Sequence, residues 1–179
     1  INAGSLTVSK NTNSPTGNVA SGATNVEVAR YDFKATGEAI RIDTIYLYST
    51  ASLYQVKLYV DGSQVGTAAN VATTTSSTIS IGNNFIVPAG TTKQLVVKAD
   101  IKDSTSSSIN KTSGTSFTFT LRNTGNTAGS LYTKQTSGTS GVSGSTSSAN
   151  ALTVKTGTLT AAKNLSYGDR STAAPTGVV

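Results

Sequence analysis

Apolar and polar residues alternate along most of this chain, and that alternation restricts the fold more than any other feature of the sequence. In residues 93–101 the apolar side chains occupy every second position: Leu95, Val97, Ala99 and Ile101. Successive side chains of a strand point to opposite faces, so this pattern predicts a strand with one buried face. No window shows the 3.6-residue period of a long amphipathic helix.

The same pattern predicts short strands throughout the chain, with turn residues such as Asp61-Gly62 between them. Many short strands with frequent turns are typical of an all-β protein, and we expect an immunoglobulin-like antiparallel β-sandwich with a C-terminal extended strand or tail. The expected strands cover residues 5–9, 26–35, 39–48, 53–60, 64–67, 77–81, 84–87, 93–101, 115–122, 130–134, 151–155 and 157–162.

Two of these strands change phase partway along. Their apolar positions shift parity between Val28 and Tyr31, and again between Ile42 and Ile45. One extra residue restores the buried face, so a β-bulge is expected in each. In residues 53–60 we expect Tyr54, Val56, Leu58 and Val60 to be buried. The expected core contains Phe33, Ile42, Leu47, Val56, Leu58, Leu95, Val97, Phe117 and Phe119.

Two segments are of low complexity, residues 103–116 and residues 135–149. Both are rich in Ser, Thr and Gly and contain too few apolar side chains to order themselves as core. We expect them to be long surface loops or a flexible edge, and they are candidate carriers of O-glycans.

The composition excludes much of enzymology. The chain contains no His and no Cys, so it has no imidazole base, no thiol nucleophile and no zinc ribbon. Asp100 and Asp103 are the closest acidic pair in sequence, at the expected end of a strand. A solvated strand end is the simpler interpretation, and a Ca²⁺ site completed by loop carbonyls is the alternative. We expect no enzyme activity and no cofactor other than, at most, calcium.

Charge and hydropathy indicate the surroundings of the chain. The net charge of +6 comes from basic residues that are scattered singly, which disfavours binding to nucleic acid. No apolar run approaches 18 residues, so no membrane span is expected. The chain starts at Ile1 without a basic and apolar leader, as expected of a mature secreted product or of a fragment. Richness in Thr, Ser, Gly and Asn favours an extracellular or cell-surface location.

One sequence pattern occurs twice, at an offset of 153 residues. Gly4-Ser5-Leu6-Thr7 and Lys10-Asn11 return as Gly157-Thr158-Leu159-Thr160 and Lys163-Asn164. We therefore divide the chain into a β-sandwich domain, 1–156, and an extension, 157–179, that is a donor strand for a neighbour or the start of a next domain. The candidate assembly residues are Leu6, Val8, Leu152, Val154, Leu159 and Ala161.

Other surface groups are candidates for contacts. Tyr46, Tyr48 and Tyr59 are expected on the outer face of two adjacent strands, as a sugar platform, a subunit contact or a simple shield for the sheet. Two glycosylation sequons begin at Asn110 and Asn164, and chance occurrence explains them equally well.

The chain resembles a known family at GSLTVS (4–9), LYVDGSQVG (58–66), VPAGTTKQLVVKADI (87–101) and ALTVKTGTLT (151–160). These motifs resemble those of the immunoglobulin-like β-sandwich domains repeated in large secreted bacterial cell-surface proteins of surface-layer or filament type. The resemblance implies surface display and tandem or polymeric assembly, and it implies no catalytic residues.

Two functions follow as hypotheses. The first is a non-enzymatic extracellular subunit that assembles with copies of itself, head to tail, into a filament, sheath or surface layer by β-strand addition. The second is an adhesin or carbohydrate-binding module from a longer repeat protein, with the tyrosines as its glycan site.

Overall fold

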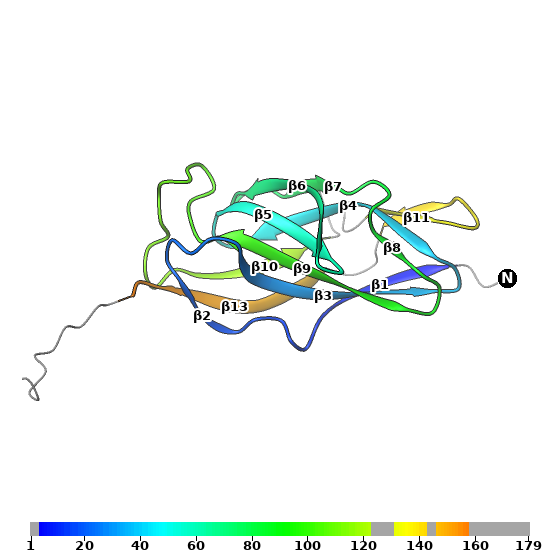
Figure 1. The fold of residues 1–179 in the computed structure, drawn as a ribbon, viewed down its shortest axis with the longest axis horizontal. Coiled ribbons are helices and arrows are strands. Elements are labelled where there is room, and N and C mark those ends of the chain that lie inside the picture. Colours follow the sequence, from blue (N-terminus) through cyan, green and yellow to red (C-terminus); the bar gives the residue numbers. More distant parts are fainter. Residues whose placement is uncertain (1–3, 123–130, 143–145, 158–179) are drawn as a thin grey trace, which may run out of the picture.

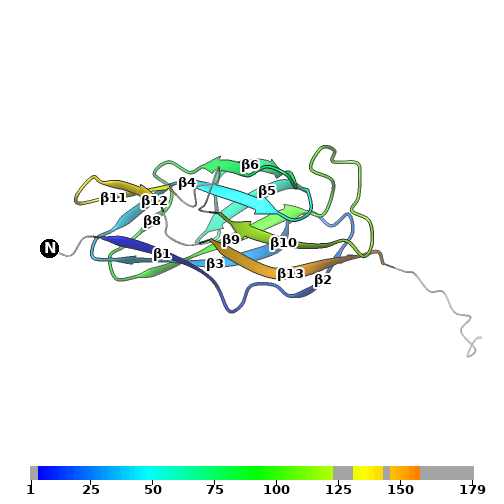
Figure 2. The same ribbon diagram turned by 180° about the vertical axis from the view of Figure 1, so that it is seen from behind.

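Two β-sheets packed face to face form the framework of the described part of the chain (Figure 1). The computed structural model describes residues 4–122, 131–142 and 146–157. Of these residues 60% lie in strands and none lies in a helix, which confirms the expected all-β sandwich. Figure 2 shows the same two layers from behind.

The first sheet contains five strands, and every neighbouring pair in it is antiparallel. In spatial order they are β1 (Ser5–Lys10), β3 (Val26–Thr36), β9 (Thr92–Asp100), β5 (Leu53–Val60) and β6 (Ser63–Val71).

The second sheet contains eight strands. Six lie side by side in the order β12 (Ser140–Val142), β11 (Leu131–Lys134), β4 (Ile40–Ser49), β10 (Ser116–Leu121), β13 (Ser147–Lys155) and β2 (Gly17–Ala20). The remaining two, β7 (Ser77–Ser80) and β8 (Ile86–Val87), also pair with β4. β2 runs parallel to β13, while the other pairs of this sheet are antiparallel.

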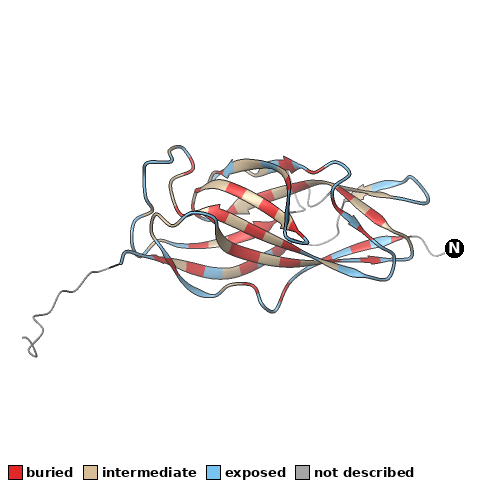
Figure 3. Ribbon diagram, viewed as in Figure 1, coloured by how far each residue is buried: buried red, intermediate tan, exposed pale blue. Residues whose placement is uncertain are grey.

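The inner faces of the two sheets share one hydrophobic core. Figure 3 shows buried residues recurring at alternate positions along the strands, as the period of two predicts. All nine side chains expected in the core are buried, each with 1% or less of its surface exposed.

The phase changes correspond to shifts in strand register. The pairing of β3 with β9 shifts between Glu27 and Ala29, so that Val28 and Ala29 are both buried. The pairing of β4 with β11 shifts between Ile42 and Thr44. Both bulges were expected from the sequence, the first within about a residue of its place.

The expectation that Tyr54 is buried was wrong. The register of β5 shifts against both of its neighbours near this point, and Gln55 adopts a positive φ of 48°. The irregularity turns Leu53 inward and leaves Tyr54 half-buried. Leu53 and Tyr54 are adjacent and both apolar enough to be buried. The sequence pattern alone does not show which of the two points into the core when a bulge lies beside them.

The low-complexity segments differ in outcome. The segment 103–116 contains no named strand before its last residue, Ser116, where β10 begins, so it is a loop over nearly all of its length, as expected. Within 135–149, β12 lies at the edge of the eight-stranded sheet, an edge being one of the two alternatives expected, whereas the start of β13 at Ser147 was not expected. β2 is also unexpected, since it lies in a segment rich in Ser, Thr, Pro and Gly. Short strands pair through backbone groups and need few apolar side chains, so composition did not indicate them.

The path of the chain leads from one end of the molecule to the other. β1 begins at the end where β3 finishes, and Gly4 lies against Glu38 in the β3–β4 turn. β13 finishes at the opposite end, where Ser21 N donates to Lys155 O (Figure 1). The strand expected over 157–162 lies outside the described residues from 158 onward.

Candidate functional site

β1 is an edge strand with one described neighbour, β3. Its register runs from Ser5 opposite Thr36 to Lys10 opposite Tyr31. Leu6 and Val8 point into the core and are 7% and 4% exposed. The side chains between them face the solvent, so apolar matching on one face and backbone pairing hold this strand in place.

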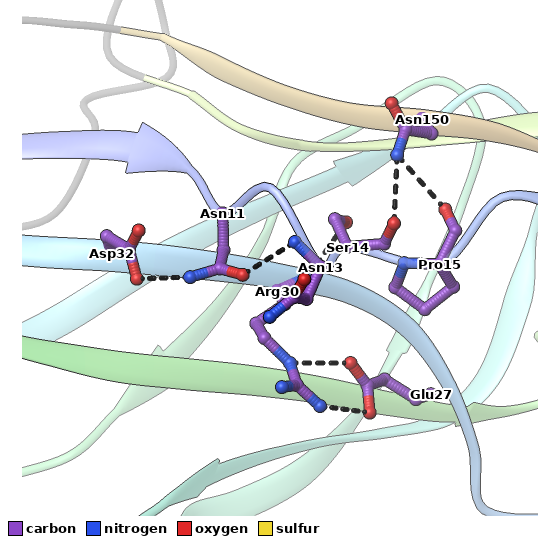
Figure 4. A network of polar contacts seen from close by, with 8 residues as sticks. All are labelled: Asn11, Asn13, Ser14, Pro15, Glu27, Arg30, Asp32 and Asn150. Atoms are coloured by element: carbon purple, nitrogen blue, oxygen red, sulfur yellow. Dashed lines mark hydrogen bonds and ion pairs between the residues drawn. The ribbon is translucent and has the colours of Figure 1, made fainter.

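A network of amide side chains fixes the point where the chain leaves β1 and crosses to the second sheet (Figure 4). Asn11 is buried; its Nδ2 donates to Asp32 Oδ1 at 2.7 Å, and its Oδ1 accepts from Asn13 N at 2.8 Å. Arg30 N then donates to Ser14 Oγ at 3.1 Å. These bonds position the crossing, because a buried amide must be hydrogen-bonded to be tolerated.

Asn150 on β13 joins the same crossing from the other sheet. Its Nδ2 donates to the carbonyl oxygens of Ser14 and Pro15 at 3.0 and 3.3 Å, and its Oδ1 accepts from Lys10 Nζ at 2.6 Å. The chain then continues as β2 beside β13. In the sequence, the only indication that Lys10 and Asn11 matter is that the same pair recurs as Lys163 and Asn164.

The six candidate assembly residues separate into three groups. Leu6 and Val8 lie on β1, at one edge. Leu152 and Val154 are almost wholly buried on β13, between β10 and β2. They complete the core of their own domain and are not free to enter a neighbour. Leu159 and Ala161 lie outside the described residues.

Glu38 forms a junction at the end of the molecule where β1 begins, and sequence analysis missed it. Its carboxylate accepts hydrogen bonds from Thr136 N, Ser137 N and Ser137 Oγ at 2.9 to 3.0 Å. These bonds, that from Ser137 N foremost, hold the pKa of Glu38 below its ordinary value. They also fix the side chain that faces Gly4, where an added Cβ would overlap Glu38 Cγ.

The structure does not bring the three candidate tyrosines together. Tyr46 and Tyr48 lie on β4 in the eight-stranded sheet, and Tyr59 lies on β5 in the other sheet. The expectation that these strands are adjacent was wrong, because the connection after β4 changes sheets. Tyr48 stacks under the guanidinium of Arg122, whose Cζ is 3.5 Å from the ring centroid.

A shallow groove on the outer face of the five-stranded sheet contains Tyr59. Its volume is about 330 Å³, and Lys98 Nζ lies 4.9 Å from the centroid of the Tyr59 ring. Arg30 closes one side in a two-pronged ion pair with Glu27, at 2.9 Å for both bonds. Asp61 and Gln94 also line it. An aromatic ring among hydrogen-bonding side chains is the kind of surface that contacts polar ligands.

The acidic pair is held by protein donors. Asp100 Oδ1 accepts from Asn25 N at 2.8 Å. Asp103 Oδ1 accepts hydrogen bonds from the hydroxyl and the backbone N–H of Thr105, and these bonds lower the pKa of Asp103. The other carboxylate oxygen, Oδ2, lies 3.8 Å from Lys111 Nζ. A neighbouring ammonium group opposes cation binding. Within residues 4–122, 131–142 and 146–157, no three His, Cys, Asp or Glu side chains gather where they could hold a metal ion.

Of the two sequons, one lies in the described part of the chain. Asn110 is exposed and pairs with Lys102 through an isolated bridge. Its neighbour Lys111 accepts through its carbonyl oxygen from Ser21 Oγ, and Ser21 N donates to Lys155 O at the end of β13. The Asn110 side chain lies near Gly22. Asn164 lies outside the described residues.

Comparisons with family models, with curated proteins and with solved structures find no match to this chain. The described part of the chain holds no helix with the length and apolarity that a membrane crossing requires.

Proposed function

We propose that this chain is a non-enzymatic structural unit of the cell exterior, joined to copies of itself head to tail in a filament, sheath or surface layer. The observation that carries the proposal is the position of the first and last described strands. β1 begins at one end of the long axis and β13 finishes at the other (Figure 2). A contact between unlike ends is heterologous, so it repeats along a line instead of closing.

The strand order supports an immunoglobulin-like sandwich of the kind repeated in bacterial cell-surface proteins. Seven strands follow the constant-type arrangement, β1-β3-β9-β5 in one sheet and β4-β10-β13 in the other. The first strand of the sandwich is divided into β1, which pairs antiparallel with β3 in one sheet, and β2, which pairs parallel with β13 in the other. Domains of this shape, with ends at opposite poles, suit linear arrays.

Sedimentation velocity over a range of concentrations tests this function. The full chain should form species that grow with concentration, while a chain truncated after Lys155 should remain a monomer. The truncation keeps every described strand, so circular dichroism and the melting temperature should be unchanged. Equal sedimentation of the two chains at all concentrations would contradict the proposal.

A second candidate, a carbohydrate-binding module, is favoured by the groove around Tyr59. A sugar could stack on the ring and exchange hydrogen bonds with Arg30, Asp61 or Gln94. Calorimetry with a panel of soluble glycans would show saturable binding that Tyr59→Ala removes and Tyr46→Ala, on the opposite sheet, retains. The absence of binding to every glycan of the panel would count against this candidate.

A further inference from the structure

We propose that residues 157–164 act as a second β1, which pairs with β3 of another copy of this domain. The inference rests on the proposed head-to-tail function and names its acceptor surface: the β3 edge, with Glu38 at one end and Asp32 at the other. The partner is therefore a second copy of this fold, and the link is antiparallel strand pairing.

The contacts of β1 explain which residues recur in the extension. Every structurally restricted position of the first copy is kept or replaced by a smaller apolar residue in the second. Gly4 has no room for a Cβ beside Glu38 and recurs as Gly157. The two core positions of β1, Leu6 and Val8, recur as Leu159 and Ala161.

The end of the pattern follows the same rule. Lys10 binds Asn150 and recurs as Lys163, and the buried Asn11 binds Asp32 and recurs as Asn164. By contrast the exposed Ser9 is replaced by Ala162. The exposed Thr7 also recurs, as Thr160, but most of the recurring residues are ones that β1 needs in order to occupy its place.

The segment cannot occupy this place in its own chain. Gly157 follows Lys155 by two residues, which span at most about 7 Å. The place of Gly4 is beyond the far end of β3, whose eleven residues extend roughly 35 Å. Lys155 lies near the beginning of β3, since Ser21 N donates to Lys155 O and Ala23 O accepts from Ile101 N. Only another copy, stacked end to end, presents its β3 edge at Gly157.

In an intact acceptor the resident β1 competes for the same edge. Ala161 has two fewer carbons than Val8, so the donated strand buries less apolar surface and binds roughly tenfold more weakly on that account. The resident strand is also tethered, which raises its effective concentration. Exchange therefore depends on how firmly residues 5–10 hold, and weakening them should increase it.

Disulfide trapping between two full-length chains tests the register. The chain has no cysteine, so each variant carries a single thiol. The donor carries Thr160→Cys and the acceptor carries Lys34→Cys with Leu6→Ala, which weakens the resident strand. Thr160 should lie opposite Lys34, because Thr7 does, and both Thr7 and Lys34 are exposed. We expect the mixed disulfide in several-fold excess over a control donor with Thr176→Cys. Equal yields would overturn the inference.

A glycine substitution supplies the second test. Among the residues that the structure describes, none would lie within 4 Å of a Cβ at Gly157, so Gly157→Val should leave the fold of the donor unchanged. In the acceptor the new side chain would collide with Glu38, so the mixed disulfide should fall several-fold, and Glu38→Ala in the acceptor should restore part of it. Gly177→Val is the matched control and should have no effect. An unchanged yield with Gly157→Val would exclude the place of Gly4 as the acceptor.

The two proposals fail in different ways. Filaments of the full chain that form without the mixed disulfide would overturn this inference and leave the structural function standing. A specific mixed disulfide with the weakened acceptor, combined with full chains that never associate, would overturn head-to-tail self-assembly and leave the strand pairing standing.

Discussion

The hydroxyl of Tyr31 lies inside the sandwich, and its removal should change stability in a way that depends on pH. Tyr31 on β3 is fully buried, and its hydroxyl donates to Phe119 O on β10 at 3.0 Å. The pairing of β10 with β13 shifts in register between Thr118 and Thr120. The Tyr31 hydroxyl therefore donates to a backbone carbonyl, that of Phe119, at a point where the strand pairing is irregular. Tyr31→Phe leaves that carbonyl without this donor, at a cost of about 1–2 kcal/mol near pH 8.

Burial raises the pKa of Tyr31 far above its ordinary value of 10, and a backbone hydrogen bond from Ala149 opposes this only in part. Below pH 10 the hydroxyl is protonated in both the folded and unfolded chains. Above pH 10 the unfolded chain releases the proton and the folded chain keeps it, so stability falls by about 1.4 kcal/mol per pH unit. Phenylalanine has no ionisable hydroxyl, so the Tyr31→Phe variant does not lose this part of its stability above pH 10.

Urea unfolding at pH 8 and pH 11 measures the effect. The stability difference between the natural chain and Tyr31→Phe should shrink by about 1.4 kcal/mol between these values, which brings it close to zero. Phe33→Leu, a core change without a titrating group, serves as the control, and its stability deficit should be the same at both pH values. A Tyr31→Phe deficit that stays constant would refute the assignment of a neutral, buried hydroxyl bridging the two sheets.

Three further predictions concern stability and ions. Phe117→Ala should destabilise the domain by about 3–5 kcal/mol in urea unfolding, because Phe117 is buried between the sheets. Hydrogen bonds lower the pKa of Glu38, so its stabilising effect is present above its ordinary value of 4.5 and is lost as pH falls through the folded value. The drop in melting temperature from pH 7 to pH 3 should therefore be smaller in Glu38→Gln. Millimolar Ca²⁺ should leave the melting temperature unchanged, because protein donors already occupy the Asp103 carboxylate. A rise in the melting temperature with Ca²⁺ would support a calcium site at Asp100 and Asp103.

The period-two pattern was sufficient for the core because burial on one face of a strand leaves a direct mark in the sequence. Phe33, Leu58 and Val97 could be assigned inward from alternation alone. The pattern fails where the backbone is irregular without a matching shift in apolar residues, as at Tyr54. It also fails where a strand is too short to show alternation, as in the four residues of β2, of which Val19 alone is buried.

The contacts between distant segments were beyond the sequence. Tyr59 and Tyr46 looked adjacent because their strands follow one another, but pairing order depends on which sheet each strand joins. Glu38 gave no signal, since its partners Thr136 and Ser137 lie almost a hundred residues away in a low-complexity segment. The recurrence of Gly4, Lys10 and Asn11 was visible, but its meaning required their contacts.

Electron microscopy of the concentrated full chain tests the central claim most directly. Head-to-tail joining predicts rows one domain wide, with the domains aligned along their long axes and linked pole to pole, and no such rows from the chain truncated after Lys155. Dispersed single domains in both samples, or rows that persist after the truncation, would contradict the account.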